Sequence, residues 1–321
     1  MPSPKLIVIL GATGNQGGSV ANVFLAESGW QAQALAARGA QVVHADLEMP
    51  STLAAAFEGA HAIFAVSDFW GLYADPSNQN KPKAGQPLNA WAGEHETQQL
   101  KHAIDAAAKI PTLERFILSS LTNVTKWSKG KYTRVYHFDS KANAADYGKQ
   151  TYPDVWKKTS IFQAGMFLSN YINNPIMKPI KSKDGTVEFL WNVEPHVKLP
   201  FIAAEEDTGP IVKELVANEE AEKNIIAYRE YLSGQELALC FEKATGLKAK
   251  SVNLPRGSFS VPLPDELKGE LEDNFAAFGE FGYESWEDLS IIHPQDLKSP
   301  PSLDTVENYF KKQDLSMIFR T

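Results

Sequence analysis

The stretch KLIVILGATGNQGGSV, residues 5–20, decides the fold of this chain. Its first part, KLIVIL, is an aliphatic run of the kind that forms a strand buried on both faces of a parallel sheet, and residues 15–28 then have helical spacing. In that context Gly11 permits a tight turn, Gly14 lets the backbone approach a pyrophosphate, and Gly17 lets helix and strand pack closely. Phosphates would lie on the free N–H groups that begin the helix. The sequence therefore predicts a dinucleotide-binding turn made of Gly11, Ala12, Thr13, Gly14, Asn15, Gln16 and Gly17.

Strands and helices alternate along the first half of the chain. We expect strands at 41–44, 61–66, 115–118 and 159–163, and helices at 51–57, 94–109 and 138–148, with Ser51 as an N-cap. This spacing predicts an α/β fold with a Rossmann-type doubly wound parallel sheet and helices on both faces. The polar segment 71–92 is expected to be a long loop.

The regular alternation of strands and helices ends at about residue 165, after which prolines become frequent. We expect strands at 186–191, 225–231 and 248–254, and helices at 208–217, 234–245, 275–281 and 306–310. The chain thus divides into a dinucleotide-binding domain, residues 1–164, and a smaller C-terminal α/β region, residues 165–321, interleaved with the sheet. That region should form the cleft wall opposite the cofactor, with the candidate lining residues Phe167, Tyr171, Trp191 and Phe201.

Composition excludes several classes of protein. The 321 residues carry a net charge of −8, which argues against direct nucleic-acid binding, since that needs a basic face. The single cysteine, Cys240, permits no intramolecular disulfide and fits a reducing compartment. We find no signal peptide and no apolar run of the roughly 18–20 residues that a membrane span needs. We therefore expect a cytoplasmic protein, with a nuclear location also open, and no membrane partner.

Several short motifs carry a family resemblance. In chain order they are GATGNQGGSV at 11–20, DL at 46–47, VSDFW at 66–70, SSL at 119–121, HFDSK at 137–141 and AGMF at 164–167. Through their order and spacing, residues 5–255 resemble the NmrA-like family, whose members are atypical extended short-chain dehydrogenases/reductases. Some members are redox-responsive regulators of transcription factors, and others are oxidoreductases of small-molecule pathways.

The resemblance implies NADP(H) as the cofactor, with NAD(H) not excluded. It also implies which residues besides the glycine turn line the cofactor: Asp46, Leu47, Ser67, Asp68, Phe69, Lys141, Gly165, Met166 and Phe167.

One expected element is missing from the sequence. The residue that distinguishes NAD from NADP should end a second strand about 20 residues beyond the glycine turn. Here residues 27–40 lead almost directly from one helix into the end of the next, and a short turn cannot join neighbouring parallel strands. We expect the second strand to be missing or degenerate, unless the gene model is in error there. Arg38 is then a helix-end cation, with a 2′-phosphate contact as the less favoured alternative. The prediction is weak cofactor binding.

The catalytic position also departs from the usual pattern. Short-chain dehydrogenases carry Tyr-x-x-x-Lys on one helix face, where the lysine binds the nicotinamide ribose and the tyrosine passes a proton. The matching residues here are His137 and Lys141. An imidazole titrates near neutral pH and could act as acid or base, but a purely structural histidine is the favoured alternative. We expect a ribose contact for Lys141.

Further polar residues follow the expected strands. Ser119 and Ser120 stand where ligands bind in open α/β sheets, and they could polarise a substrate carbonyl or cap a turn. Asp46 could contact the adenine side of the cofactor or cap its own turn. His95 and His102 lack a third ligand at metal-site spacing, so we expect no metal.

Two functions from different classes follow. The first is an NADP(H)-dependent oxidoreductase that acts on a small organic molecule in a specialised pathway. Hydride would come from a nicotinamide held over Lys141, and the proton from His137 or a water. The alternative is a non-catalytic NADP(H) redox sensor that regulates a transcription factor through protein–protein contact.

Overall fold

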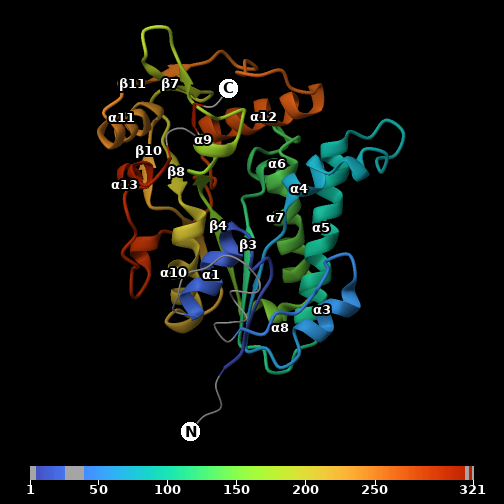
Figure 1. Cartoon of the computed structure of the whole chain (residues 1–321). Helices are drawn as coiled ribbons and strands as arrows, with labels where there is room; N and C mark the ends of the chain where they lie inside the picture. The colour runs from blue at the N-terminus through green and yellow to red at the C-terminus, as the bar shows by residue number, and fades with distance from the viewer. Residues whose placement is uncertain (1–4, 26–39, 315–317, 320–321) are drawn as a thin grey trace.

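The computed structural model of the chain describes residues 5–25, 40–314 and 318–319. Its centre is a parallel sheet of six strands in the order β1-β2-β3-β4-β9-β12 (Figure 1). The strands are β1 Ile7–Ile9, β2 Ala62–Ala65, β3 Arg115–Ser120, β4 Thr159–Ala164, β9 Asn224–Ala227 and β12 Ile291–Ile292. The predicted Rossmann-type parallel sheet is therefore confirmed, and β9 and β12 join it from the C-terminal half.

Helices cover both faces of this sheet, as right-handed crossovers require. Adjacent strand residues alternate between the two sides: Phe64 and Ile117 pack under one layer, while Ile63 and Phe116 pack under the other. The first layer contains α1 Asn15–Leu25 and α10 Ala204–Ala217. The second contains α3 Pro50–Ala56, α5 Leu88–Ala107, α7 Tyr136–Thr151 and α8 Pro153–Trp156.

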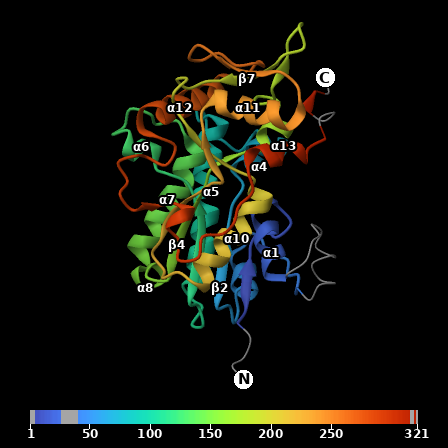
Figure 2. The ribbon, with the colours of Figure 1, turned by 90° about the vertical axis from the view of Figure 1, so that its left-hand side faces the viewer.

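A second region lies beyond the carboxyl ends of the strands, and Figure 2 shows α11, α12 and β7 together at that end of the molecule. It holds two three-stranded sheets and a large aromatic core. The strands are β5 Met166–Phe167, β6 Ile180–Lys181, β7 Val187–Trp191, β8 Leu199–Ile202, β10 Glu230–Leu232 and β11 Ala249–Asn253. The helices are α9 Asn170–Asn173, α11 Gly234–Thr245, α12 Asp265–Phe281 and α13 Val306–Lys311. Short helices α4 Phe69–Ala74 and α6 Val124–Trp127 and the 3-10 turns η1 Pro76–Asn78 and η2 Pro294–Asp296 complete the described elements.

Several sequence expectations need correction. Residues 41–44 form no strand, and α3 begins at Pro50 with Met49 as N-cap, so Ser51 lies inside the helix. The expected loop 71–92 is shortened at both ends by α4 and α5. The single strand expected at 225–231 is two strands in different sheets, because the chain leaves β9 and pairs with β8 as β10.

The expected gap after the first helix is only partly described. Residues 40–49 contain no strand, whereas residues 27–35 and Arg38 lie outside the described residues. No part of a second strand therefore lies between residues 40 and 49.

Helices α1 and α10 touch at backbone level. A Cβ atom added to Gly209 of α10 would overlap the carbonyl oxygen of Ser19 in α1, and the Gly209 N–H donates to the Ser19 hydroxyl at 2.8 Å. The atoms that such a Cβ would meet belong to the Ser19 backbone and the branched Val23 side chain, so none of them can easily move away. The spacing of the two helices therefore requires glycine at 209.

We predict that Gly209→Ala destabilises the protein by about 1–3 kcal/mol, the usual cost of overpacking a core. Urea unfolding would measure the change. The matched control is Gly279→Ala in α12, where a Cβ would meet only the carboxylate of the Glu194 side chain. Equal stabilities of the two variants would contradict the proposed backbone contact.

Candidate functional site

The glycine turn has the geometry of a phosphate cradle. Gly11 adopts a positive φ of 62°, and the Gly14 N–H donates to the Gly11 carbonyl at 2.8 Å. A Cβ on Gly17 would overlap the Gly11 carbonyl, so helix and strand need glycine there. By contrast, a Cβ on Gly14 would lie 3.4 Å from the Gly11 oxygen, in ordinary contact. The N–H groups of the first turn of α1 lack acceptors within the helix, so the turn fits a pyrophosphate.

Ser119 joins the end of β3 to this turn. Its side chain is buried, and its hydroxyl donates to Gln16 Oε1 at 2.8 Å. Ser120 is also buried, and its hydroxyl donates a long hydrogen bond of 3.4 Å to the Leu121 carbonyl. The structure therefore brings Ser119 against the predicted cofactor turn.

The segment after residue 45 is held against α5. Asp46 Oδ1 accepts from the Glu48 N–H at 2.9 Å, which is the geometry of a turn cap. His102 Nδ1 lies 2.7 Å from the Leu47 carbonyl, and His95 Nε2 lies 2.7 Å from Glu48 Oε1. The hydrogen bonds of Asp46 thus favour the turn-capping alternative, and the two histidines fasten this loop to α5.

The residues after β2 have three different roles. Ser67 donates its hydroxyl proton to Glu96 Oε1 at 2.7 Å. Asp68 caps α4 by accepting from the Gly71 N–H at 2.9 Å. The Phe69 ring is buried, with its centroid 5.7 Å from that of His137. This segment therefore meets α7 at Lys141 and His137.

Lys141 is paired with a buried carboxylate. Its ammonium lies 2.7 Å from Glu96 Oε1, and the Glu96 side chain is fully buried. It also donates to the His137 carbonyl at 3.0 Å, while the Ser140 hydroxyl donates to Glu96. The ammonium also lies 2.8 Å from Glu96 Oε2, so its three donors already face acceptors in Glu96 and the His137 carbonyl.

His137 is held by a second buried carboxylate. Its Nδ1 lies 2.6 Å from Glu270 Oε1 of α12, and the same oxygen accepts the His137 backbone N–H at 3.1 Å. Asn89 donates to the other oxygen, Glu270 Oε2, at 2.9 Å. An ionised carboxylate only accepts, so Nδ1 carries the proton in this contact. Among the described residues, Nε2 has no hydrogen-bond partner, and the Trp70 ring covers the imidazole at a centroid distance of 4.8 Å.

The expected lining residues of the C-terminal region lie mostly in its core. Gly165 sits where β4 meets β8, and a Cβ there would be 2.6 Å from the Pro200 carbonyl. Met166 and Phe167 follow as β5. Tyr171 and Trp191 are each 2 % exposed and pack around Phe201. A cavity of only about 20 Å³ lies between them, so they form no open cleft wall in this structure.

Other candidate groups are occupied or shielded. Burial raises the pKa of the Cys240 thiol to about 11, so it is protonated and unreactive at neutral pH. In the part of the chain that the structure describes, no group of three or more His, Cys, Asp or Glu side chains could hold a metal ion. No helix among those residues is long and apolar enough to cross a membrane.

Sequence reasoning missed Glu96, Glu270 and Asn89. A signal was available for the two carboxylates, because each occupies the apolar face of an amphipathic helix. Glu96 precedes Leu100 at helical spacing, and Glu270 follows Leu267. A carboxylate on a buried face needs a cation or several donors, and α7 provides them.

The fold and the glycine turn define a Rossmann-type α/β protein with a dinucleotide-binding motif. The model of the NmrA-like family matches residues 3–310, and the chain belongs to this family.

The individual relatives compared here share between 21% and 27% of their residues with this chain. The NmrA-like family domain-containing oxidoreductase hkm9 of Aspergillus hancockii is 27% identical over 304 residues, covering 86% of this chain and 82% of that protein. The nitrogen metabolite repression protein nmrA of Emericella nidulans is 24% identical over 185 residues, covering 56% and 51%. The crystal structure of NmrA, a negative transcriptional regulator, in complex with NADP matches with a TM-score of 0.74 at 21% identity, covering 96% of this chain and 94% of that chain.

We predict that Lys141→Met destabilises the protein by roughly 3–5 kcal/mol, because it leaves Glu96 buried without its cation. The double variant Lys141→Met/Glu96→Gln should recover much of this loss, since it removes the unpaired charge. Urea unfolding of both variants would test the pair. A single variant as stable as the parent would contradict the structural role of Lys141.

Proposed function

We propose that this chain is an NADP(H)-dependent oxidoreductase that reduces a small organic molecule, with NAD(H) as a possible second cofactor. The observation that carries the proposal is the His137–Glu270 pair, because it supplies a proton-carrying side chain at the position where short-chain dehydrogenases have tyrosine. The family relatives that are named oxidoreductases support the same class of reaction.

Different residues would bind the cofactor and transfer the proton. The first turn of α1 would hold the pyrophosphate, and Lys141 would turn one donor from the His137 carbonyl to the nicotinamide ribose. Bound NADPH would supply a hydride to an electrophilic carbon of the substrate. Glu270 fixes Nδ1–H of His137, so a protonated Nε2 can donate to the substrate heteroatom, and the resulting imidazole is restored by solvent. Trp70 and Phe69 shield one side of the imidazole.

A second candidate is the non-catalytic redox sensor, located in the cytoplasm or nucleus, that binds a transcription factor. The observation favouring it is the tight pairing of Lys141 with Glu96, which occupies the lysine usually devoted to the cofactor. The nitrogen metabolite repression relatives support this alternative. A cofactor-dependent pull-down with transcription-factor domains tests it, and an absence of turnover with intact NADPH binding would favour it over the enzyme.

The cofactor itself can be tested with Gly14→Ala. The added methyl fits the folded turn but narrows the approach to the pyrophosphate, so we expect NADPH affinity to fall by about tenfold or more. Fluorescence titration measures affinity, and an unchanged melting temperature controls for folding. We expect the parent chain to bind more weakly than low-micromolar; a low-micromolar dissociation constant would refute the prediction of weak binding.

The proton donor can be tested with His137→Phe, assayed by NADPH consumption over carbonyl, enone and imine substrates. We expect kcat to fall about 100-fold or more, because general acid catalysis contributes at least that much. Glu270→Gln should cause a smaller loss, since an amide oxygen still accepts from Nδ1–H. His196→Gln, at an exposed loop histidine, is the matched control. Full turnover by His137→Phe would rule out His137 as the proton donor.

A further inference from the structure

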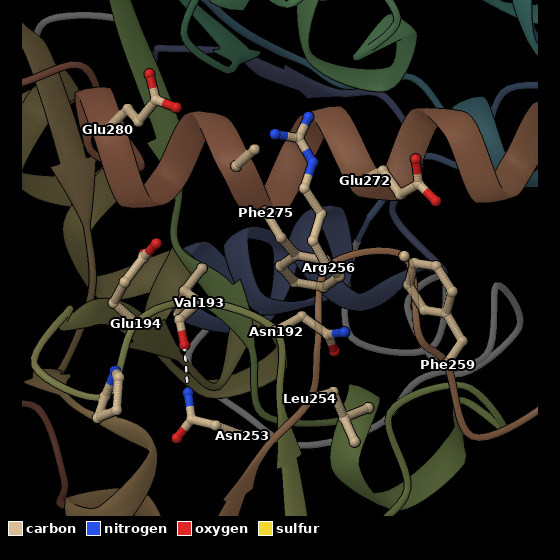
Figure 3. Close-up of a pocket in the computed structure, with 13 residues that line it drawn as sticks. Asn192, Val193, Glu194, Asn253, Leu254, Arg256, Phe259, Glu272, Phe275 and Glu280 are labelled. Carbon is tan, nitrogen blue, oxygen red and sulfur yellow. Dashed lines mark hydrogen bonds between the residues drawn. The ribbon is translucent and has the colours of Figure 1, made fainter.

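Helix α12 borders a second candidate site, on the face opposite Glu270. Glu270 and Glu272 are two positions apart, about 200° around the helix, so they point to opposite sides. A cavity of about 280 Å³ lies along the Glu272 side, just below the roughly 300–1,000 Å³ typical of small-molecule sites. Figure 3 shows its walls: α12, the loop after β7 and the segment after β11.

The two walls opposite α12 are joined by hydrogen bonds. Asn253 donates its side-chain amide to the Val193 carbonyl at 2.6 Å, the contact drawn in Figure 3. Asn192 donates to the Ser258 carbonyl at 2.8 Å, and the Leu254 N–H donates to the Trp191 carbonyl at 2.9 Å. The loops are therefore fastened together, and the cavity is preformed.

The charges that line the cavity are unevenly compensated. Glu280 is paired with Lys131 and accepts from the Tyr132 hydroxyl, and the Arg256 guanidinium lies over the Tyr132 ring at 5.7 Å. Glu194 is exposed, and its carboxylate has no hydrogen bond or ion pair among the described residues. Glu272 has only Lys268 at 4.0 Å. Among the described residues, Glu194 is thus the cavity carboxylate without a paired cation, and Arg256, which also lines the cavity, is itself in no ion pair.

Glycines make room for both of these carboxylates. A Cβ on Gly279 of α12 would overlap Glu194 Oε2, and a Cβ on Gly257 would overlap Glu272 Oε1. Each carboxylate therefore lies directly against the opposite backbone. In both cases a methyl group would displace it.

The rest of the lining is apolar and aromatic. It comprises Val193, Leu254, Phe259, Phe275 and Ala276. A smaller cavity adjoins it, sharing Asn192, Val193 and Phe275, and is lined by Trp191. The Trp191 side chain is 2 % exposed, and its Nε1–H has no acceptor. A buried donor without a partner is unfavourable.

We propose that this cavity binds a small organic cation, an amine or quaternary ammonium group attached to an apolar ring. Glu194 would pair with the positive charge, with Glu272 reinforcing it across the cavity. The Phe259 and Phe275 rings would contact the apolar body and attract the cation through their faces. Because α12 separates the cavity from His137, this site is distinct from the proposed redox centre and does not depend on cofactor binding.

Calorimetric titration of the 321-residue chain tests the proposal with three probes of similar size: benzyltrimethylammonium, benzyl alcohol and benzoate. We expect the cation to bind more tightly than the alcohol and the anion not to bind. Glu194→Gln should weaken cation binding about tenfold or more, as expected for losing a charge-assisted contact. Glu287→Gln is the charge-matched control, because its side chain is 66% exposed outside the cavity. It should leave affinity unchanged.

Gly279→Ala gives a second, steric test. Its methyl would displace the Glu194 carboxylate, while alanine favours the helix, so we expect weakened cation binding with a melting temperature that is unchanged or raised. Equal binding of cation and alcohol would overturn the proposal. Undiminished cation binding by both Glu194→Gln and Gly279→Ala, or an equal loss in Glu287→Gln, would also overturn it.

Discussion

The ion pair between Glu96 and Lys141 organises the centre of the molecule. A carboxylate with no exposed surface is stable only when its oxygens are occupied by donors, and a cation is the most effective of these. Glu96 belongs to α5, Lys141 and Ser140 to α7, and Ser67 to the end of β2. One carboxylate therefore fixes two helices and a strand end relative to one another. The position of His137, one turn before Lys141, follows from this arrangement.

A second buried carboxylate extends the same principle to the C-terminal region. Glu270 reaches from α12 to the beginning of α7, where His137 contributes both its ring and its backbone N–H. Asn89 adds a donor from α5, so three helices meet at one carboxylate. The two networks place polar atoms on one face of α7 in a largely apolar interior. The His137–Lys141 face of α7 is thus supported by α5 and by α12, and its geometry depends on how these helices pack.

The sequence predicts elements well where local signals agree. The helix expected at 234–245 has those bounds because Ser233 and Glu236 form a capping box and Gly246 ends it with a positive φ of 73°. The sequence does not predict strand boundaries that are set by pairing with strands distant along the chain. The apolar run after Asn224 carries no local sign that the chain changes sheets after Ala227. The glycine turn was predictable because its motif is local, whereas Glu270 acts on a residue 133 positions away.

Charge compensation distinguishes the two faces of α12. On the inner face, Glu270 is surrounded by donors, and Asp273 pairs with Arg134 at 2.8 Å. On the outer face, Glu194 lies against Gly279 without a cation, beside rings that cannot hydrogen-bond to it. Glu194 is exposed, so water solvates its charge and, unlike the buried Glu270, it needs no paired cation. Because Gly279 has no side chain, the Glu194 carboxylate lies directly against α12 and lines the cavity. That position suits a cationic ligand that enters the cavity from solution.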